Sequence, residues 1–431
     1  MKNTLLAIMI IYPTIVFSQD TELNWHHQSY ELDSTTGIGT NRVYDEFLMS
    51  KSNNTIIVAV LDAGVDITHK DLEGKIWINQ DEIPGNLIDD DQNGYIDDYN
   101  GWNFLGNKNG ENLEFDTWEI VRIYNQLKIK YGEYSLQNPI NNTTEYAYYK
   151  KISYEIDSLQ KQTKLEFEQW EKAKKKLDEY IYLIGKYSDN LPKTVNEIEN
   201  IQIPAFDSLA TQAKNTLINW YRSGYTKQLI DLKYNSPNIR HVYKLNTNYD
   251  TRSIIGDKPE DLSEKYYGNP DVIGPDPFHG TSVAGIIAAI RNNNFGIDGI
   301  ADNVLIMPIR VIPAGDERDK DVANAIYYAV DNGAHILNMS FGKPISPDNE
   351  HVQKAIKYAE KKGVLLITGS GNEGINIDSI PRYPNKYYLN GTECSCWITV
   401  GSCNNNPDSL FVADFSSYGA ESVDLLAPGV D

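Results

Sequence analysis

Cysteine is scarce in this sequence, and the few cysteines present are gathered in one place. Only three of the 431 residues are cysteine, namely Cys394, Cys396 and Cys403. An odd number leaves at least one thiol unpaired within the chain, a Cys-x-Cys bridge is geometrically awkward, and no fourth metal ligand stands nearby. Because Cys396 and Cys403 flank a short apolar run, we interpret the cysteines as small buried residues and assign no chemistry to them.

Positive charge is also in short supply. The chain has 39 Lys and Arg residues against 60 Asp and Glu residues, a formal net charge of −21. This balance argues against nucleic acid or an anionic membrane surface as the main partner. The first predicted strand is not followed by a glycine-rich loop, which argues against a nucleotide-binding protein. Hydrophobic residues make up 41% of the chain, so a sizeable folded core is expected.

Long apolar runs are missing after the first residues, and no later stretch is long enough to span a bilayer. Residues 1–18 contain one lysine, Lys2, then an apolar run from Leu5 to Phe17 and the small residue Ser18. This pattern is typical of a secretory signal peptide cleaved after Ser18. We therefore expect an exported protein, secreted or periplasmic, without a membrane span.

Apolar, β-branched runs recur along the chain, and helical stretches separate them. A run of this kind, ending in polar residues or glycine, is typical of a strand buried on both faces of a parallel sheet. The runs cover residues 55–66, 303–312, 334–342, 363–372 and 396–402, and the helical stretches cover 281–293, 321–333 and 350–363. The alternation predicts an α/β fold with a parallel sheet flanked by helices, whose site lies at the carboxyl ends of the strands.

The middle of the chain has a different composition, rich in Lys, Glu, Tyr and Asn. Its apolar residues fall on one helical face, at Ile152, Ile156, Leu159, Trp170, Ala173, Leu177 and Ile184. We therefore expect a helical insertion, which could guard a cleft, bind a partner or be a solvated outgrowth. The predicted organisation is a signal peptide (1–18), an N-terminal arm (19–54), the first part of the α/β domain (55–105), the insertion (106–268) and the second part (269–431).

Three polar residues stand where this fold would bring them together. Asp62 ends the first predicted strand, His279 opens a helix, and Asn372 lies on a glycine-rich turn after another strand. A buried carboxylate needs a partner, and a histidine partner would let it orient a catalytic base. A side-chain amide on such a turn can direct its N–H at an oxyanion. Each residue alone is commonly structural, but together they are the parts of an acyl-transfer site.

The sequence resembles the subtilisin-like serine peptidases. The resemblance rests on six blocks in the family's order: VAVLDAGVD, HGTSVAGIIAA, LNMSFG, GSGNEG, FSSYG and VDLLAPG. It implies a protein or peptide substrate, with Asp62 as the orienting acid, His279 as the general base and Asn372 as the oxyanion donor. It also implies a peptide-binding cleft lined by Ser340, Phe341, Gly342, Gly369, Ser370 and Gly371.

The stretch FHGTSVAG also reads as a Gly-Thr-Ser block with Ser282 as a nucleophile. In the subtilisin order of Asp, His and Ser the nucleophile comes last, whereas Ser282 precedes Asn372. We therefore interpret Ser282 as part of the histidine block. The sequence ends at Asp431 soon after LLAPG, so we expect a subtilase cut off before its serine and catalytically incomplete as given. The alternative is a non-catalytic extracellular binding module with the same fold.

An acidic stretch, DDDQNGYIDDYN, begins at Asp89. Asp89, Asp91, Asn93 and Asp97 place oxygen ligands at alternate positions around Gly94, like the start of an EF-hand calcium loop. Asn100 stands where the loop's final glutamate would be, so modest calcium affinity is expected, and the alternative is a plain acidic turn. Many subtilases bind calcium, so the resemblance to that family supports the interpretation as a calcium loop.

Overall fold

The computed structural model describes residues 24–48, 54–132, 143–188, 190–405 and 411–430. The predicted signal peptide, residues 1–18, lies outside these ranges. A helix both long enough and apolar enough to cross a bilayer does not occur in the described part of the chain.

A single seven-stranded parallel sheet forms the centre of the molecule, with strand order β2-β3-β1-β4-β5-β6-β7. This confirms the predicted α/β class. The strands are β1 (Ile56–Asp62), β2 (Trp102–Asn103), β3 (Val304–Arg310), β4 (Ile336–Met339), β5 (Leu365–Gly369), β6 (Trp397–Cys403) and β7 (Leu425–Pro428). Because β1 pairs with β3 on one side and β4 on the other, Asp62 ends a central strand.

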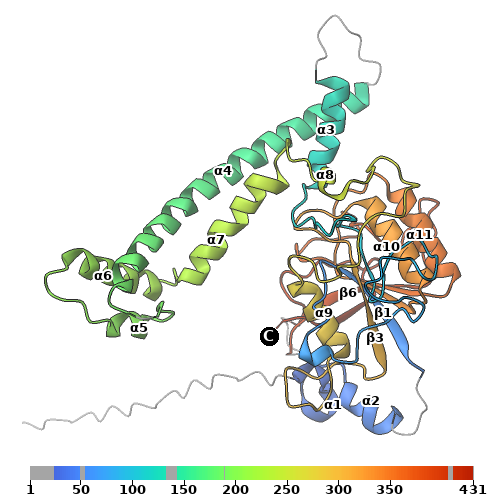
Figure 1. Cartoon of the computed structure of the whole chain (residues 1–431), viewed down its shortest axis with the longest axis horizontal. Coiled ribbons are helices and arrows are strands. Elements are labelled where there is room, and N and C mark those ends of the chain that lie inside the picture. Colours follow the sequence, from blue (N-terminus) through green and yellow to red (C-terminus); the bar gives the residue numbers. More distant parts are fainter. Residues whose placement is uncertain (1–23, 49–53, 133–142, 189, 406–410, 431) are drawn as a thin grey trace, which may run out of the picture.

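Alternate residues of β1 enter different cores, since successive side chains of a strand point to opposite faces. Val58 and Val60 pack against α9 (Phe278–Ala288), whereas Ala59 and Leu61 belong to the core formed with α10 (Asp319–Asp331) and α11 (Asn349–Lys361). The sheet is therefore covered on both faces (Figure 1). This explains why its strands are nearly continuous apolar runs.

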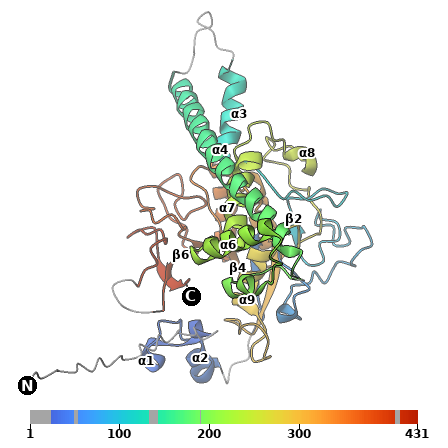
Figure 2. The same ribbon diagram turned by 90° about the vertical axis from the view of Figure 1, so that its left-hand side faces the viewer.

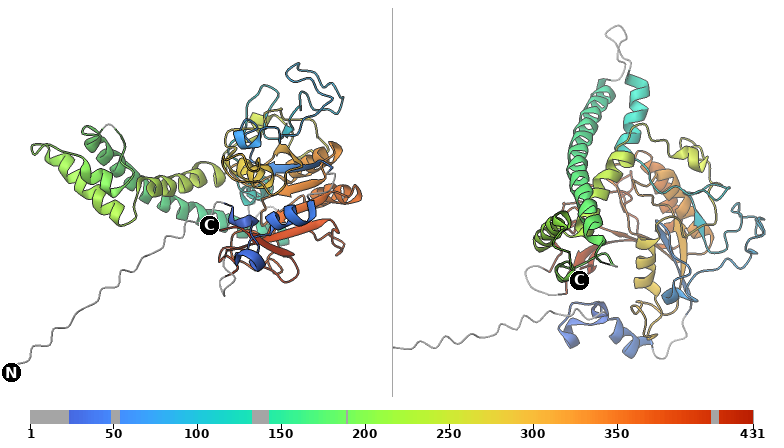
Figure 3. Two further views of the ribbon diagram at one scale, coloured as in Figure 1. Left: turned by 90° about the horizontal axis from the view of Figure 1, so that it is seen from below. Right: turned by 60° about the vertical axis from the view of Figure 1, so that its left-hand side comes forward.

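The helices of the middle region form an arm that projects from the sheet domain (Figures 1 and 2). They are α3 (Glu119–Tyr131), α4 (Thr143–Gly185), α5 (Val195–Asn200), α6 (Ser208–Arg222) and α7 (Lys227–Ile239), with the single-turn element η4 (Arg240–Lys244). The next helix, α8 (Arg252–Ile255), lies on the sheet domain, where Ile255 enters the core. Ile152 and Ile156 of α4 pack against α3, while Leu177 and Ile184 pack in a separate cluster with α5 and α6. The left panel of Figure 3 shows this arm extending to one side.

Buried ion pairs hold the base of the arm on the sheet domain. Arg252 of α8 forms pairs with Asp257 and with Asp321 of α10, and Lys343, which follows β4, contacts Glu119 of α3. All of these side chains are at most about one-tenth exposed. Their charges therefore depend on one another for compensation.

The N-terminal segment is built from η1 (Trp25–His27), α1 (Tyr30–Asp33), α2 (Thr40–Val43) and η2 (Tyr44–Leu48); a further turn, η3 (Lys70–Leu72), follows β1. The His27 ring accepts from Arg291 at 3.3 Å and lies 2.8 Å from the Asp298 carbonyl oxygen. The segment is thereby fixed to the loop that follows α9.

The three cysteines are free thiols, with Cys394 and Cys403 buried and Cys396 half-buried. Burial raises the pKa of the Cys394 and Cys403 thiols, which keeps them protonated and unreactive at neutral pH.

Candidate functional site

Asp62 and His279 meet at the carboxyl end of β1, although 217 residues separate them in the sequence. The Nδ1 atom of His279 lies 2.9 Å from each carboxylate oxygen of Asp62. Asp62 is buried, and its Oδ1 also accepts from the Ala63 N–H at 2.7 Å. The ring nitrogen facing this carboxylate carries the proton, so Nε2 is the nitrogen left to accept one.

The residues after His279 allow helix α9 to approach the strand end closely. A Cβ atom on Gly280 would lie only 2.1 Å from the Gly64 carbonyl oxygen, so any larger residue would push the helix away. The Thr281 hydroxyl donates to the Pro277 carbonyl and accepts from the Asp66 N–H at 2.8 Å. Gly280 and Thr281 therefore allow helix α9 to pack closely against the end of strand β1, which brings His279 to Asp62.

The hydrogen bond with Asp62 raises the pKa of His279 above its ordinary value, and burial of the ring opposes this shift only in part. The side chain is still 60% exposed, so the remainder of the ring faces open space. In the described part of the chain, Asp62 is the sole hydrogen-bond partner of the ring. The geometry is that of a base oriented by a carboxylate.

Ser282 does not face this ring. Its hydroxyl donates to the carbonyl of Phe278, one turn earlier in α9, at 2.8 Å, and the side chain is exposed. A serine bonded to its own helix backbone in this way is not activated by the imidazole.

A cavity of about 350 Å³ adjoins His279 and contains most of the predicted cleft residues. From the predicted set, its lining includes Ser340, Phe341, Gly342, Gly369, Gly371 and Asn372. The segment 340–342 directly follows β4, and 369–372 spans the end of β5 and its turn, so both come from neighbouring strand ends. The base and the candidate oxyanion donor thus lie on one hollow.

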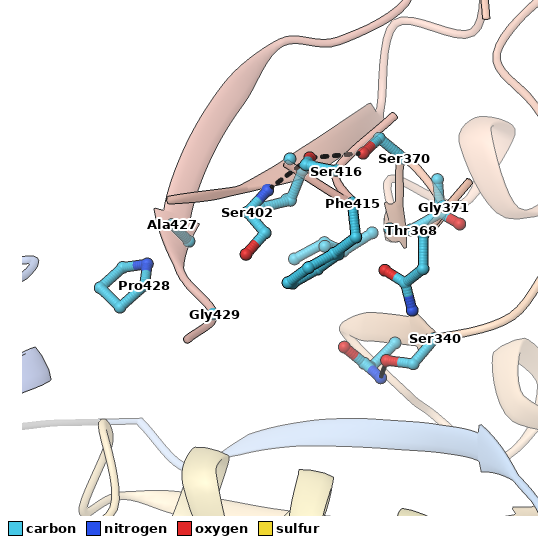
Figure 4. Close-up of a pocket in the computed structure, with 16 residues that line it drawn as sticks. Ser340, Thr368, Ser370, Gly371, Ser402, Phe415, Ser416, Ala427, Pro428 and Gly429 are labelled. Carbon is cyan, nitrogen blue, oxygen red and sulfur yellow. Dashed lines mark hydrogen bonds between the residues drawn. The ribbon is translucent and has the colours of Figure 1, made fainter. Parts of the chain in front are cut away.

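Ser370 lies elsewhere, because its side chain is buried beside a second cavity of about 490 Å³ (Figure 4). Its hydroxyl lies 3.4 Å from that of Ser416, which accepts from the Ser402 N–H at 2.9 Å. The two cavities share five lining residues, Ser340, Thr368, Gly369, Gly371 and Asn372, so they adjoin at the turn that carries Asn372.

Arg382 and Glu373 also line the cavity beside His279, and sequence reasoning did not identify them. Arg382 Nη1 lies 2.8 Å from Glu373 Oε1, and Arg382 Nη2 donates to the Gly342 carbonyl. Arg382 follows Gly342 by forty positions in an irregular segment without any periodic pattern, so the sequence gives no signal of this contact.

The carboxylates of the acidic stretch after residue 88 have different surroundings in the structure. Both oxygens of Asp97 accept from the backbone N–H groups of residues 85–87, and both oxygens of Asp89 accept from the N–H groups of Asn93 and Gly94. These two carboxylates therefore hold the loop in shape. Asp91 also accepts from the Asn93 N–H, and one of its oxygens lies within 4.8 Å of one oxygen each of Glu82 and Asp98.

This cluster has features that suit a hard cation. Glu82 is buried, and its Oε2 atom has no hydrogen-bond partner among the residues that the structure describes. Burial raises the pKa of Glu82, and burial also raises the pKa of Asp98 to about 6, so both carboxylates are costly to ionise as they stand. Three converging carboxylates, one with an orphan oxygen, form the donor set that Ca²⁺ prefers.

The family of the chain follows from comparison with known sequences. The model of the subtilase family, peptidase S8, matches residues 53–431. This chain therefore belongs to the subtilase family.

Individual relatives match only part of the chain. Thermitase of Thermoactinomyces vulgaris is 36% identical over 176 residues, which cover 39% of this chain and 57% of thermitase. Subtilisin Savinase of Lederbergia lenta is 37% identical over 155 residues, covering 36% of this chain and 51% of Savinase. The chain thus spans about half the length of these curated relatives.

Among solved structures, the epidermin leader peptide processing serine protease of Staphylococcus aureus is 23% identical, with a TM-score of 0.30. The alignment covers 37% of this chain and 43% of that chain.

Proposed function

We propose that this chain provides the acid, the base, the oxyanion donor and the peptide cleft of a subtilisin-type serine peptidase. The observation that carries the proposal is the Asp62–His279 pair beside a cavity that also contains Asn372 and segment 340–342. Membership of the subtilase family supports the same function.

In the proposed mechanism Asp62 holds the Nδ1–H of His279, so that Nε2 takes the proton of a serine hydroxyl as its oxygen attacks the scissile carbonyl. Asp62 then stabilises the imidazolium, which returns its proton to the leaving amine. The Asn372 amide donates to the oxyanion of the tetrahedral intermediate. Loss of one such donor costs about 10²–10³-fold in turnover. Water and the same base then release the acyl group.

The serine of this triad is proposed to come from outside the described residues, because within them His279 bonds only to Asp62 and Ser282 bonds to its own helix. We therefore expect the 431-residue chain by itself to bind peptide without hydrolysis above background. Stoichiometric labelling of Ser282 by a fluorophosphonate, with turnover lost in Ser282→Ala, would contradict this. Peptide binding without turnover in a version of the chain supplied with a serine block would instead favour the non-catalytic binding module.

Peptide binding in the cleft can be tested by filling it. A Cβ atom at Gly369 meets no atom within 4 Å, and Gly369 lines the cavity, so Gly369→Leu should fold normally and occupy the peptide's space. Fluorescence anisotropy of a labelled peptide should show that binding is lost. Gly185→Leu is the matched control, because Gly185 is equally free of neighbours but ends α4 in the arm. Equal binding by both variants would refute a peptide site in this cavity.

We further propose that Glu82, Asp91 and Asp98 hold a calcium ion that stabilises the loop beside the sheet. Millimolar calcium should raise the melting temperature, since an ion that binds only the folded state at about 100 times its Kd stabilises it by about 2.7 kcal/mol. Glu82→Gln and Asp91→Ala should abolish the rise, whereas the exposed Glu350→Gln should keep it. A melting temperature indifferent to calcium would rule out the site.

Export is proposed from residues 1–18 of the sequence. N-terminal sequencing of protein recovered outside the cytoplasm should begin at Gln19, and an intact Met1 would contradict cleavage after Ser18.

A further inference from the structure

The side chain of Arg382 joins the two walls of the candidate cleft. One end of its guanidinium donates to the carbonyl of Gly342, on the segment after β4. The other end lies 2.8 Å from Glu373, the residue that directly follows Asn372. The side chain is 20% exposed, so part of the cation faces the cavity that contains His279. The proposed acyl-transfer steps make no use of this charge.

The direction of the Gly342 carbonyl follows from how its neighbour is paired. Lys343 exchanges two backbone hydrogen bonds with Tyr383, each 2.9 Å long, in an antiparallel bridge. Successive residues of an extended segment direct their N–H and C=O groups to opposite sides. The Gly342 carbonyl therefore points away from Tyr383. It is the acceptor that an extended peptide would meet on this segment, and Arg382 already occupies it.

Resting on the proposed function, we propose that Arg382 determines peptide specificity by selecting peptides with an acidic side chain near Gly342. A peptide that pairs with Gly342 displaces the guanidinium from the carbonyl and takes away a charge-assisted hydrogen bond. An Asp or Glu side chain of the peptide restores such a bond. With a neutral peptide side chain, the displaced guanidinium bonds only to solvent, and a Lys side chain repels it. Discrimination between peptides therefore contains both an attractive and a repulsive element.

Glu373 sets the strength of this preference. The Glu373 carboxylate neutralises part of the positive charge of Arg382. It also holds the guanidinium in place after the guanidinium has left the Gly342 carbonyl. The Ser417 hydroxyl also lies 3.4 Å from Glu373, which fixes the carboxylate from behind. Removing the Glu373 charge should therefore leave a guanidinium that attracts an acidic peptide more strongly.

The test uses fluorescein-labelled alanine hexapeptides in which one Asp, Asn or Lys is placed at each position in turn. Fluorescence anisotropy with the 431-residue chain should show, at one position, binding about five- to tenfold tighter for Asp than for Asn, the range of a partly exposed charge-assisted bond. Arg382→Ala should remove this preference and tighten binding of the Asn peptide, because the Gly342 carbonyl becomes free. Arg382→Lys should keep part of the preference, and Glu373→Gln should increase it.

Lys354→Ala, on the exposed side of α11, is the control and should change no affinity. The proposal is overturned if the unaltered chain shows no preference for Asp, or if the preference survives Arg382→Ala. An unchanged preference in Glu373→Gln overturns it as well. The last variant decides the matter should Arg382→Ala fail to fold. Absence of any peptide binding, in all variants alike, overturns the proposed function and this inference with it.

Discussion

The ring of His279 lies between a buried carboxylate and an open cavity, and this position determines when it can accept a proton. Its pKa is raised mainly by the hydrogen bond with Asp62. A raised folded-state pKa stabilises the fold below the unfolded value, and this contribution is lost as pH rises through the folded pKa. The neutral ring, the form that the proposed mechanism needs, predominates only above that raised value.

Replacing Asp62 by Asn should therefore lower the pKa of His279 toward or below its ordinary value. An NMR titration of the His279 ring protons would measure the shift directly, without any need for turnover. The same titration of the unaltered chain provides the reference. An unchanged His279 titration in Asp62→Asn would show that the carboxylate does not control the ring.

Individual residues also show the limit of what a pattern can predict. The sequence around Asp62, His279 and Asn372 predicted a strand end, a helix start and a turn after a strand. Asp62 contacts His279, and His279 and Asn372 line one cavity, because parallel strands end at one edge of the sheet. Arg382 carries no such signal, since its partners come from a different turn and a different strand end. Likewise, the alternating acids marked the loop, but the sequence does not show which of its carboxylates bond to backbone amides, as both oxygens of Asp89 and Asp97 do.

Among the strands and helices, those with strong periodicity were predicted well. The run 303–312 contains β3, and the stretch 321–333 contains most of α10. Strand β2 has only two residues, Trp102 and Asn103, and such a short element has no period to read. It forms because it pairs with the end of β3, which is a tertiary cause.

Lys343 couples α3 of the arm to the end of β4, and breaking this link should be costly. Its ammonium contacts Glu119 at 2.6 Å and Asp319 at 2.8 Å, all three being largely buried. Lys343→Met leaves two buried carboxylates short of a partner, and we expect a loss of about 3–5 kcal/mol in urea unfolding. Lys354→Met breaks an exposed pair with Glu350 and should cost about 0.3–0.5 kcal/mol. Similar losses for both would argue against a buried coupling.

Two sets of buried groups should each contribute stability that acid removes, in two separate pH windows. Burial lowers the pKa of His26 and His27, helped by the nearby charge of Arg291 and opposed by the Asp298 carbonyl. Below pH 6.5 these two rings bind protons in the unfolded chain but not in the folded chain, so their contribution to stability falls. Burial would raise the pKa of Asp116, but Arg318 and Arg122 outweigh it and hold the value at about 2, so that loss comes at much lower pH.

The first window can be assigned by mutation. His27→Gln keeps a donor for the Asp298 carbonyl and an acceptor for Arg291 but cannot titrate. Its melting temperature should fall less between pH 7.5 and pH 5.5 than that of the unaltered chain, by about 1–4 °C. His241→Gln should retain the full fall. An equal fall in His27→Gln would place the sensitivity elsewhere.

The order of the strands has a consequence for synthesis. Strand β1 is made early, yet Ile56 pairs with Val304 and Val58 with Ile336, so both of its neighbours emerge from the ribosome more than two hundred residues later. At about 5–20 residues per second that is a wait on the order of ten to fifty seconds. The arm, whose contacts are local, is complete before the sheet can close. The nascent chain therefore carries a finished helical appendage and an unpaired apolar strand at the same time, which pulse proteolysis of stalled chains would reveal.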